Sequence, residues 1–130
     1  MNTPDMKIEV VPIPVADVDR AKAFYVEQVG FHLDFDTQAG ETIRMVQLTP
    51  PGSACSIVIG TGLGDISEMV PGSVKGVTLV VKKVSEMRDL LMSRGVAVSD
   101  IVEYPREIRF AYFNDPDGNS WALQEFPPTL

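Results

Sequence analysis

Residues 110–126 read FAYFNDPDGNSWALQEF, two apolar runs joined by the polar segment NDPDGN at residues 114–119. Asp, Pro, Gly and Asn set the backbone angles of tight turns, and the flanking runs are aromatic and aliphatic. The stretch therefore predicts a β-hairpin. A hairpin needs further strands to form a stable sheet, and the chain before it supplies them.

The half of the chain that contains this hairpin predicts the order βαβββ. Residues 74–81 are rich in β-branched side chains and predict a strand. Residues 85–94 carry apolar side chains at helical spacing, with Ser85 as a capping residue and Gly95 as the left-handed terminator. Three further strands are predicted at residues 96–102, 107–113 and 120–126.

The first half predicts the same order. Residues 6–15 alternate loosely as a strand, and the prolines at positions 12 and 14 place its second half at a sheet edge. Asp17 or Asp19 can cap a helix over residues 18–29, which Gly30 ends. Three strands follow at residues 31–36, 42–48 and 54–59.

The two halves form an internal repeat. The glycines that end the helices, Gly30 and Gly95, are 65 residues apart, and the hairpin glycines, Gly52 and Gly118, are 66 apart. Self-similarity at a fixed spacing indicates two copies of one structural unit. We therefore predict a single α+β domain over residues 1–130, with modules at about 6–60 and 73–127, a glycine-rich linker at about 60–72, and curved sheets around a shared cleft.

Composition limits the classes of partner. The chain has 130 residues, a net charge of −7 and a pI near 4.5, which disfavour nucleic acid and anionic membranes as partners. Cys55 is the single cysteine, so no internal disulfide is possible and a reducing compartment is expected. No apolar run has the length of a membrane span, and the first residues lack the pattern of a signal peptide. We predict a cytoplasmic protein.

The segment PVADVDRAKAFYVEQVGF at residues 14–31, together with FAYFNDPDGNSWALQE at residues 110–125, resembles the glyoxalase, bleomycin-resistance and extradiol-dioxygenase superfamily, the vicinal oxygen chelate fold. The resemblance covers nearly the whole chain. It implies a cleft between two curved sheets and a homodimer.

The resemblance also implies where metal-using members carry their ligands. Those positions are occupied here by Val10, Ser56, Val77 and Ala122. Valine and alanine offer no lone pair, and a neutral hydroxyl is a poor ligand on its own. His32, the single histidine, lies outside the pattern. We therefore predict no metal and no other cofactor.

The predicted cleft lining follows from strand alternation around those positions. The face of Ala122 also holds Gln124, and the resemblance suggests Ile108, Phe110 and Tyr112 in the paired strand. Overlay of the repeat adds Arg44 and Val46 to these residues and Ser56. The predicted ligand-binding residues are Arg44, Val46, Ser56, Ile108, Phe110, Tyr112, Ala122 and Gln124. A mostly apolar lining with a few polar groups is typical of a small-molecule pocket.

Three functions fit this pattern. The first is a metal-free protein that binds a small aromatic or cationic molecule in the cleft, as the bleomycin-binding relatives do. The second is an enzyme of the superfamily, of the lyase, isomerase or dioxygenase type, that uses Tyr112, Arg44 or Glu103 with an unconventional metal or none. The third is a structural or partner-binding module whose cleft is filled by its own side chains.

Overall fold

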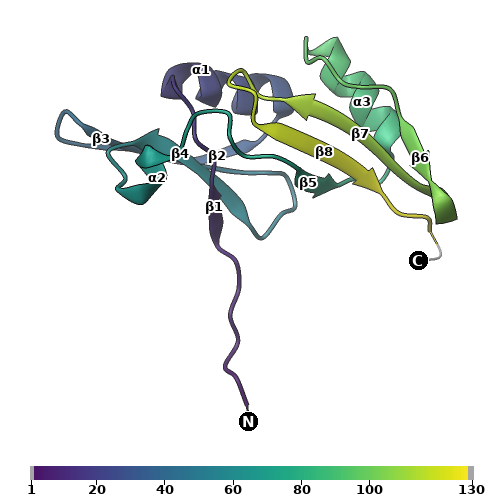
Figure 1. Ribbon diagram of the computed structural model, residues 1–130, viewed down its shortest axis with the longest axis horizontal. Helices are drawn as coiled ribbons and strands as arrows, with labels where there is room; N and C mark the ends of the chain where they lie inside the picture. The colour runs from purple at the N-terminus through teal and green to yellow at the C-terminus, as the bar shows by residue number, and fades with distance from the viewer. Residues whose placement is uncertain (1, 129–130) are drawn as a thin grey trace.

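The computed structural model describes residues 2–128, which form two four-stranded sheets (Figure 1). Sheet A has the strand order β1-β4-β3-β2, and sheet B has the equivalent order β5-β8-β7-β6. Strand β1 runs parallel to β4 in sheet A, and β5 runs parallel to β8 in sheet B. All other neighbouring strands are antiparallel. The predicted α+β fold of two βαβββ modules is confirmed.

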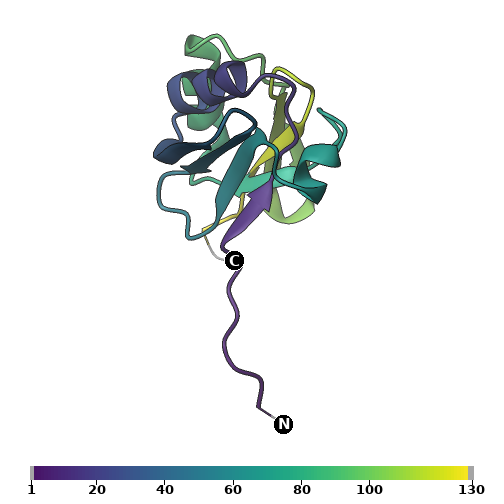
Figure 2. The ribbon, with the colours of Figure 1, turned by 90° about the vertical axis from the view of Figure 1, so that its left-hand side faces the viewer.

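Sheet A consists of β1 (Val10–Pro12), β2 (His32–Ala39), β3 (Ile43–Thr49) and β4 (Ser56–Thr61). Sheet B consists of β5 (Val77–Val80), β6 (Val102–Tyr104), β7 (Ile108–Asn114) and β8 (Ser120–Glu125). The helices are α1 (Val18–Ala23), which continues into the π-helix η1 (Phe24–Val29), α2 (Asp65–Glu68), α3 (Val84–Ser93) and a 3₁₀ turn, η2 (Pro105–Glu107). Both α1 and α3 lie on the same side of the sheets (Figures 1 and 2).

Three predicted strands are shorter in the structure, and the one predicted at residues 74–81 is reduced to β5 at Val77–Val80. Strand β1 begins at Val10, because β4 begins at its partner Ser56 and offers nothing for residues 6–8 to pair with. Residues 2–9 extend away from both sheets (Figure 2). The strand predicted at residues 96–102 pairs regularly only from Val102 onward, although Ser99 also bonds to Tyr112 of β7.

The predicted ends of the long helices are confirmed at Asp17, Gly30 and Gly95, but the predicted cap at Ser85 is wrong, because α3 begins at Val84 and Ser85 lies inside its first turn. The Asp17 side chain accepts a hydrogen bond from the Arg20 amide at 3.1 Å and caps α1. Gly30 and Gly95 have φ of 94° and 85°, the left-handed conformation that favours glycine at a helix end. At α3 the cap comes from outside the helix, since Glu125 of β8 accepts from the Val84 amide at 2.8 Å.

One hydrophobic core joins the two modules. It lies between the helices and the sheet faces that they cover, and includes side chains from β3, β4, β7 and β8 as well as from all three long helical segments. Its centre is aromatic: Trp121 is fully buried and its ring lies 5.6 Å from those of Tyr25 and Phe31. Such contacts fix how the first module sits on the second.

A buried polar network ties the last hairpin to this core. The Asp115 carboxylate accepts hydrogen bonds from the Tyr25 hydroxyl at 2.7 Å, from the Asn119 side chain at 2.7 Å and from the Asn119 and Asp117 amides at 2.9 and 3.0 Å. Trp121 donates to the Tyr25 hydroxyl at 2.9 Å. Burial and the Asp115 charge raise the pKa of Tyr25 well above its ordinary value, so the phenol remains a donor.

The hairpin between β6 and β7 is strained. Arg106 and Glu107 have φ of 69° and 60°, where a residue with a Cβ pays about 1 kcal/mol or more. We expect Arg106→Gly to raise the free energy of unfolding by about 0.5 kcal/mol, because relief of the steric cost exceeds the added freedom of the unfolded chain. Urea denaturation measures the change.

Thr37→Gly is the matched control for this prediction. Thr37 lies in the exposed strand β2 without a positive φ, so glycine there should lower the free energy of unfolding by about 1 kcal/mol. Equal destabilisation by the two substitutions would show that the left-handed conformation at Arg106 carries no cost.

Candidate ligand-binding faces

Each sheet has one face covered by helices and one face turned away from them, which we call its open face. In sheet B the covered face carries the buried side chains of Ala111, Phe113, Trp121 and Leu123. The alternate residues of the same strands lie on the open face. Five predicted cleft residues therefore share it: Ile108, Phe110, Tyr112, Ala122 and Gln124.

A row of aromatic rings crosses the open face of sheet B. Tyr104 of β6 meets Phe110 edge-on at 5.5 Å, and Phe110 lies parallel to Tyr112 at 6.1 Å with 7° between the ring planes. Tyr104 and Tyr112 are 46% and 39% exposed. The nearby Tyr104 hydroxyl raises the pKa of Tyr112, so the Tyr112 phenol is a neutral donor at physiological pH. The row offers a flat apolar surface with hydroxyls at its edge.

Two residues predicted in the cleft lie on the covered face of sheet A instead. Val46 is fully buried in the core. Arg44 donates to Asp36 at 3.1 and 2.9 Å and to Asp19 of α1 at 2.7 Å. The overlay of the repeat is therefore wrong by one residue in β3, and a shift of one moves a side chain to the other face. Met45 and Gln47 occupy the open face in their place.

The strand pairing shows on which sheet face each position implied for a metal ligand lies. Val10 and Ser56 pair in sheet A, as expected for two residues on one face. Val77 is opposite Trp121 and packs with the core, whereas Thr78 is the residue opposite Ala122. The expectation for Val77 is thus also wrong by one.

With that correction the open-face positions hold Val10, Ser56, Thr78 and Ala122. Two aliphatic side chains and two neutral hydroxyls do not fit the ligand set of a tightly bound metal ion. Within residues 2–128 there is also no group of three His, Cys, Asp or Glu side chains placed to hold one.

The open face of sheet A carries a polar network that was not predicted. The Asp34 carboxylate accepts hydrogen bonds from the Thr49 hydroxyl and from the Gln47 amide, the latter at 3.1 Å. Thr49 in turn lies 2.6 Å from the buried Ser56 hydroxyl. Ser56 therefore takes part in a hydrogen-bonded chain that ends at a carboxylate.

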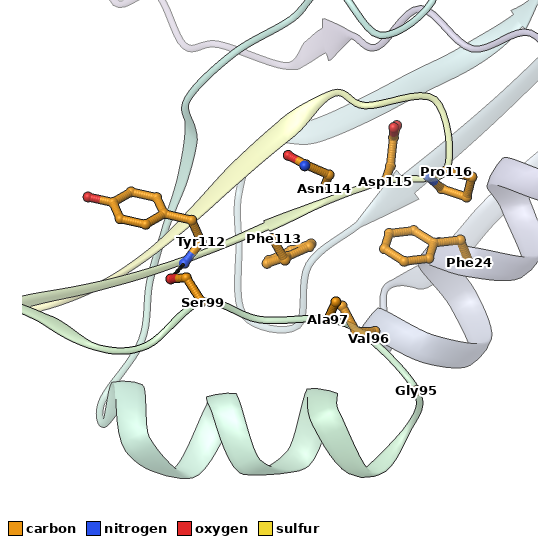
Figure 3. A pocket seen from close by; sticks show the side chains of 10 residues that line it. All are labelled: Phe24, Gly95, Val96, Ala97, Ser99, Tyr112, Phe113, Asn114, Asp115 and Pro116. Carbon is orange, nitrogen blue, oxygen red and sulfur yellow. Dashed lines mark hydrogen bonds between the residues drawn. The ribbon is translucent and has the colours of Figure 1, made fainter.

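A separate cavity of about 430 Å³ lies on the helix side of sheet B (Figure 3). Phe24, Val96 and Phe113 form its apolar part, and Ser99 and Asn114 contribute polar atoms. In Figure 3 the Tyr112 ring extends away from Phe24 and Phe113. Tyr112 therefore borders both the cavity and the aromatic row, whereas Tyr104 and Phe110 do not line the cavity. Alternation along the strands gave no sign of this cavity.

The chain is similar in sequence and structure to proteins of one superfamily. The sequence model of the Glyoxalase/Bleomycin resistance protein/Dioxygenase superfamily matches residues 7–123. The crystal structure of TnmS3, an antibiotic binding protein from Streptomyces sp. CB03234, superposes with a TM-score of 0.84 at 36% identity, covering 97% of this chain and all of that one.

Two further proteins are similar to the chain over most of its length. A glyoxalase/bleomycin resistance protein from the same Streptomyces strain has a TM-score of 0.77 and 38% identity, covering 92% of this chain and 100% of its own. The uncharacterized protein YetH of Bacillus subtilis is 27% identical over 125 residues, which are 92% of this chain and 98% of that protein. In the described residues no helix is long and apolar enough to cross a membrane.

Proposed function

The chain belongs to the glyoxalase/bleomycin resistance protein/dioxygenase superfamily, and from that premise we propose that it binds a small organic molecule, antibiotic-like in size, and sequesters it without chemical change. The observation that carries the proposal is the aromatic row of Tyr104, Phe110 and Tyr112 on an open sheet face. An exposed aromatic surface of this kind suits a flat ligand better than a polar substrate.

The relative with antibiotic-binding function supports this proposal. TnmS3 shares 36% of its sequence with this chain over nearly the full length of both. Fold similarity alone would not carry a function across, because one fold hosts many functions. The aromatic row supports the proposed binding function independently of the fold, because it supplies the kind of surface that binding an organic ligand requires.

We further propose that the binding cleft is completed in a homodimer. The open faces carry exposed apolar side chains that the chain leaves uncovered, among them Phe35, Ile43, Met45, Val80, Tyr104 and Tyr112. A second copy could place its sheet A over sheet B of the first, so that both open faces line one cleft. The extended residues before β1 would then lie close to the partner.

A cytoplasmic location remains a prediction from the single cysteine.

The contacts of the predicted acid–base residues favour binding over catalysis. Arg44 is held by two aspartates on the covered face. Glu103 forms an ion pair at 3.3 Å with Arg109, which also bonds to Glu125. Tyr112 stays on the open face, but its raised pKa makes it a poor base at neutral pH. We therefore route no reaction step through these groups or through a metal.

The test is equilibrium dialysis of untagged protein against a panel of aromatic antibiotics, with the bound fraction analysed by mass spectrometry. We expect saturable binding at a fixed stoichiometry, recovery of the ligand unchanged, and no effect of EDTA. Elemental analysis of the same sample should find less than one metal ion per site. Turnover of a bound compound, or a stoichiometric metal whose removal abolishes binding, would contradict sequestration and support the enzyme alternative.

A further inference from the structure

We propose that Asp34 is a ligand-binding residue on the open face of sheet A, where its carboxylate accepts a hydrogen bond from a protonated amine of the bound molecule. This inference rests on the proposed binding function and adds the ligand class: an aromatic molecule that also carries a basic nitrogen.

A β-bulge places Asp34 on the open face. Leu33 pairs with Leu48 and Phe35 pairs with Gln47, so Asp34 is an extra residue in β2 without a partner of its own in β3. Its hydrogen bonds to Gln47 and Thr49 show that its side chain lies on the same face as theirs. The bulge thus presents Asp34 and Phe35, which are adjacent in sequence, on one face. Bulges commonly redirect a side chain in this way beside binding sites.

Neighbouring side chains hold the carboxylate in place. Gln47 donates to Oδ2 at 3.1 Å, and the Thr49 hydroxyl donates to the same oxygen. The Ser56 hydroxyl, 2.6 Å from that of Thr49, extends the chain of hydrogen bonds into the buried part of β4. A carboxylate fixed before the ligand arrives loses little conformational freedom on binding.

The other carboxylate oxygen is left open. Oδ1 lies 3.8 Å from Nε2 of His32, which is beyond hydrogen-bond distance, and no hydrogen bond within residues 2–128 ends on it. The side chain is 24% exposed, so a ligand can reach it. The hydrogen bond from Thr49 holds the pKa of Asp34 below its ordinary value, which keeps the group ionised at neutral pH.

The next carboxylate along the strand shows the contrast. Asp36 lies on the covered face, where Arg44 and Lys22 both donate to it. Among the described residues Asp34 has no Lys or Arg within ion-pair distance. One carboxylate of β2 is therefore neutralised inside the fold by Lys and Arg side chains, while the other faces the proposed cleft with only the His32 imidazole, 3.8 Å from Oδ1, beside it. A ligand cation would form an ion pair with that carboxylate.

The test compares two fluorescent probes of one shape, 9-(aminomethyl)anthracene, which is protonated at neutral pH, and 9-anthracenemethanol, which is neutral. Fluorescence titration of the full-length protein should show about tenfold tighter binding of the amine, the usual gain from a charge-assisted hydrogen bond. In Asp34→Asn the preference should fall to about equal affinity, while the affinity for the alcohol stays unchanged.

Asp36→Asn is the matched control, because it removes the same charge from the same strand on the opposite face. It should retain the preference for the amine, which separates a local contact from attraction by the overall negative charge. Equal binding of both probes by the unsubstituted protein would overturn the role of Asp34 and leave the proposed function standing. Binding of neither probe would overturn both. Circular dichroism of each variant checks that it is folded.

Discussion

Asp115→Ala is expected to lower the free energy of unfolding by about 3–5 kcal/mol, because it leaves several buried donors without an acceptor. The carboxylate is buried and accepts from Tyr25, from both nitrogens of Asn119 and from the Asp117 amide. After truncation the Tyr25 hydroxyl and the Asn119 backbone amide would lie in the core without an acceptor, whereas the Asn119 side chain would keep its hydrogen bond to the Pro14 carbonyl. Urea denaturation followed by far-ultraviolet circular dichroism measures the loss.

Asp117→Ala is the control in the same hairpin. Asp117 forms an ion pair with Arg20, whose side chain is 52% exposed, and its second carboxylate oxygen has no hydrogen-bond partner in the described chain. The Asp117 side chain is itself only 6% exposed, but its partner is exposed and its buried second oxygen gains no hydrogen bond from the fold, so we expect the ion pair to contribute about 1 kcal/mol. A loss at Asp115 no larger than the loss at Asp117 would show that the network is not what joins the hairpin to the helix.

Tyr25→Phe separates the contributions within the network. It removes a single hydroxyl, which both donates to Asp115 and accepts from Trp121, and preserves the ring packing. A loss of about 1–3 kcal/mol is expected, smaller than for Asp115→Ala.

The features that the sequence predicted correctly are those determined by neighbouring residues. The turn chemistry of NDPDGN, the helix cap at Asp17 and the left-handed glycines at positions 30 and 95 each depend on a few adjacent side chains. Their recurrence at a fixed spacing was enough to derive the βαβββ order. Within sheet B, alternation from Ala122 gave the correct face, because β7 and β8 pair without a bulge.

The errors arise where register depends on the partner strand. The repeat was used to transfer the open-face positions of sheet B to β3. The register differs, so Arg44 and Val46, which were predicted on the open face, lie on the covered face, and the same error was made for Val77. Asp34 was missed because the bulge in β2 exists only relative to β3. The sequence there, HLDFD, alternates regularly and gives no sign that two consecutive residues share a face.

The hairpin carboxylates show the same limit in another form. Asp115 and Asp117 were interpreted as turn-forming residues, and Asp115 does accept from the Asp117 amide within the turn. Its other oxygen bonds to Tyr25, 90 residues away in sequence. A contact at that separation follows from how the two modules pack, and local turn chemistry carries no information about it.

The second large effect is expected on binding. We predict that Tyr112→Ala weakens binding of 9-anthracenemethanol about tenfold and that Phe110→Ala with Tyr112→Ala weakens it at least about a hundredfold, because stacked aromatic side chains dominate such sites. The neutral probe makes this result independent of Asp34. Both rings lie on the open face of sheet B, so their removal should cost the fold little compared with a core truncation.

Met92→Ala is the control for the aromatic pair, since Met92 is an exposed apolar residue on α3, away from the open face. Its affinity for the probe should be unchanged. Full affinity in the double variant would exclude the aromatic row as the binding surface and point to the cavity lined by Phe24 and Val96. Ala97→Trp narrows that cavity. If the ligand bound in the cavity, this substitution would abolish binding. Because we propose that the ligand binds at the aromatic row, we expect it to leave the affinity unchanged. Tyr112 borders both surfaces, but Phe110 belongs only to the aromatic row and Ala97 only to the cavity, so the substitutions at those two residues assign the ligand to one surface.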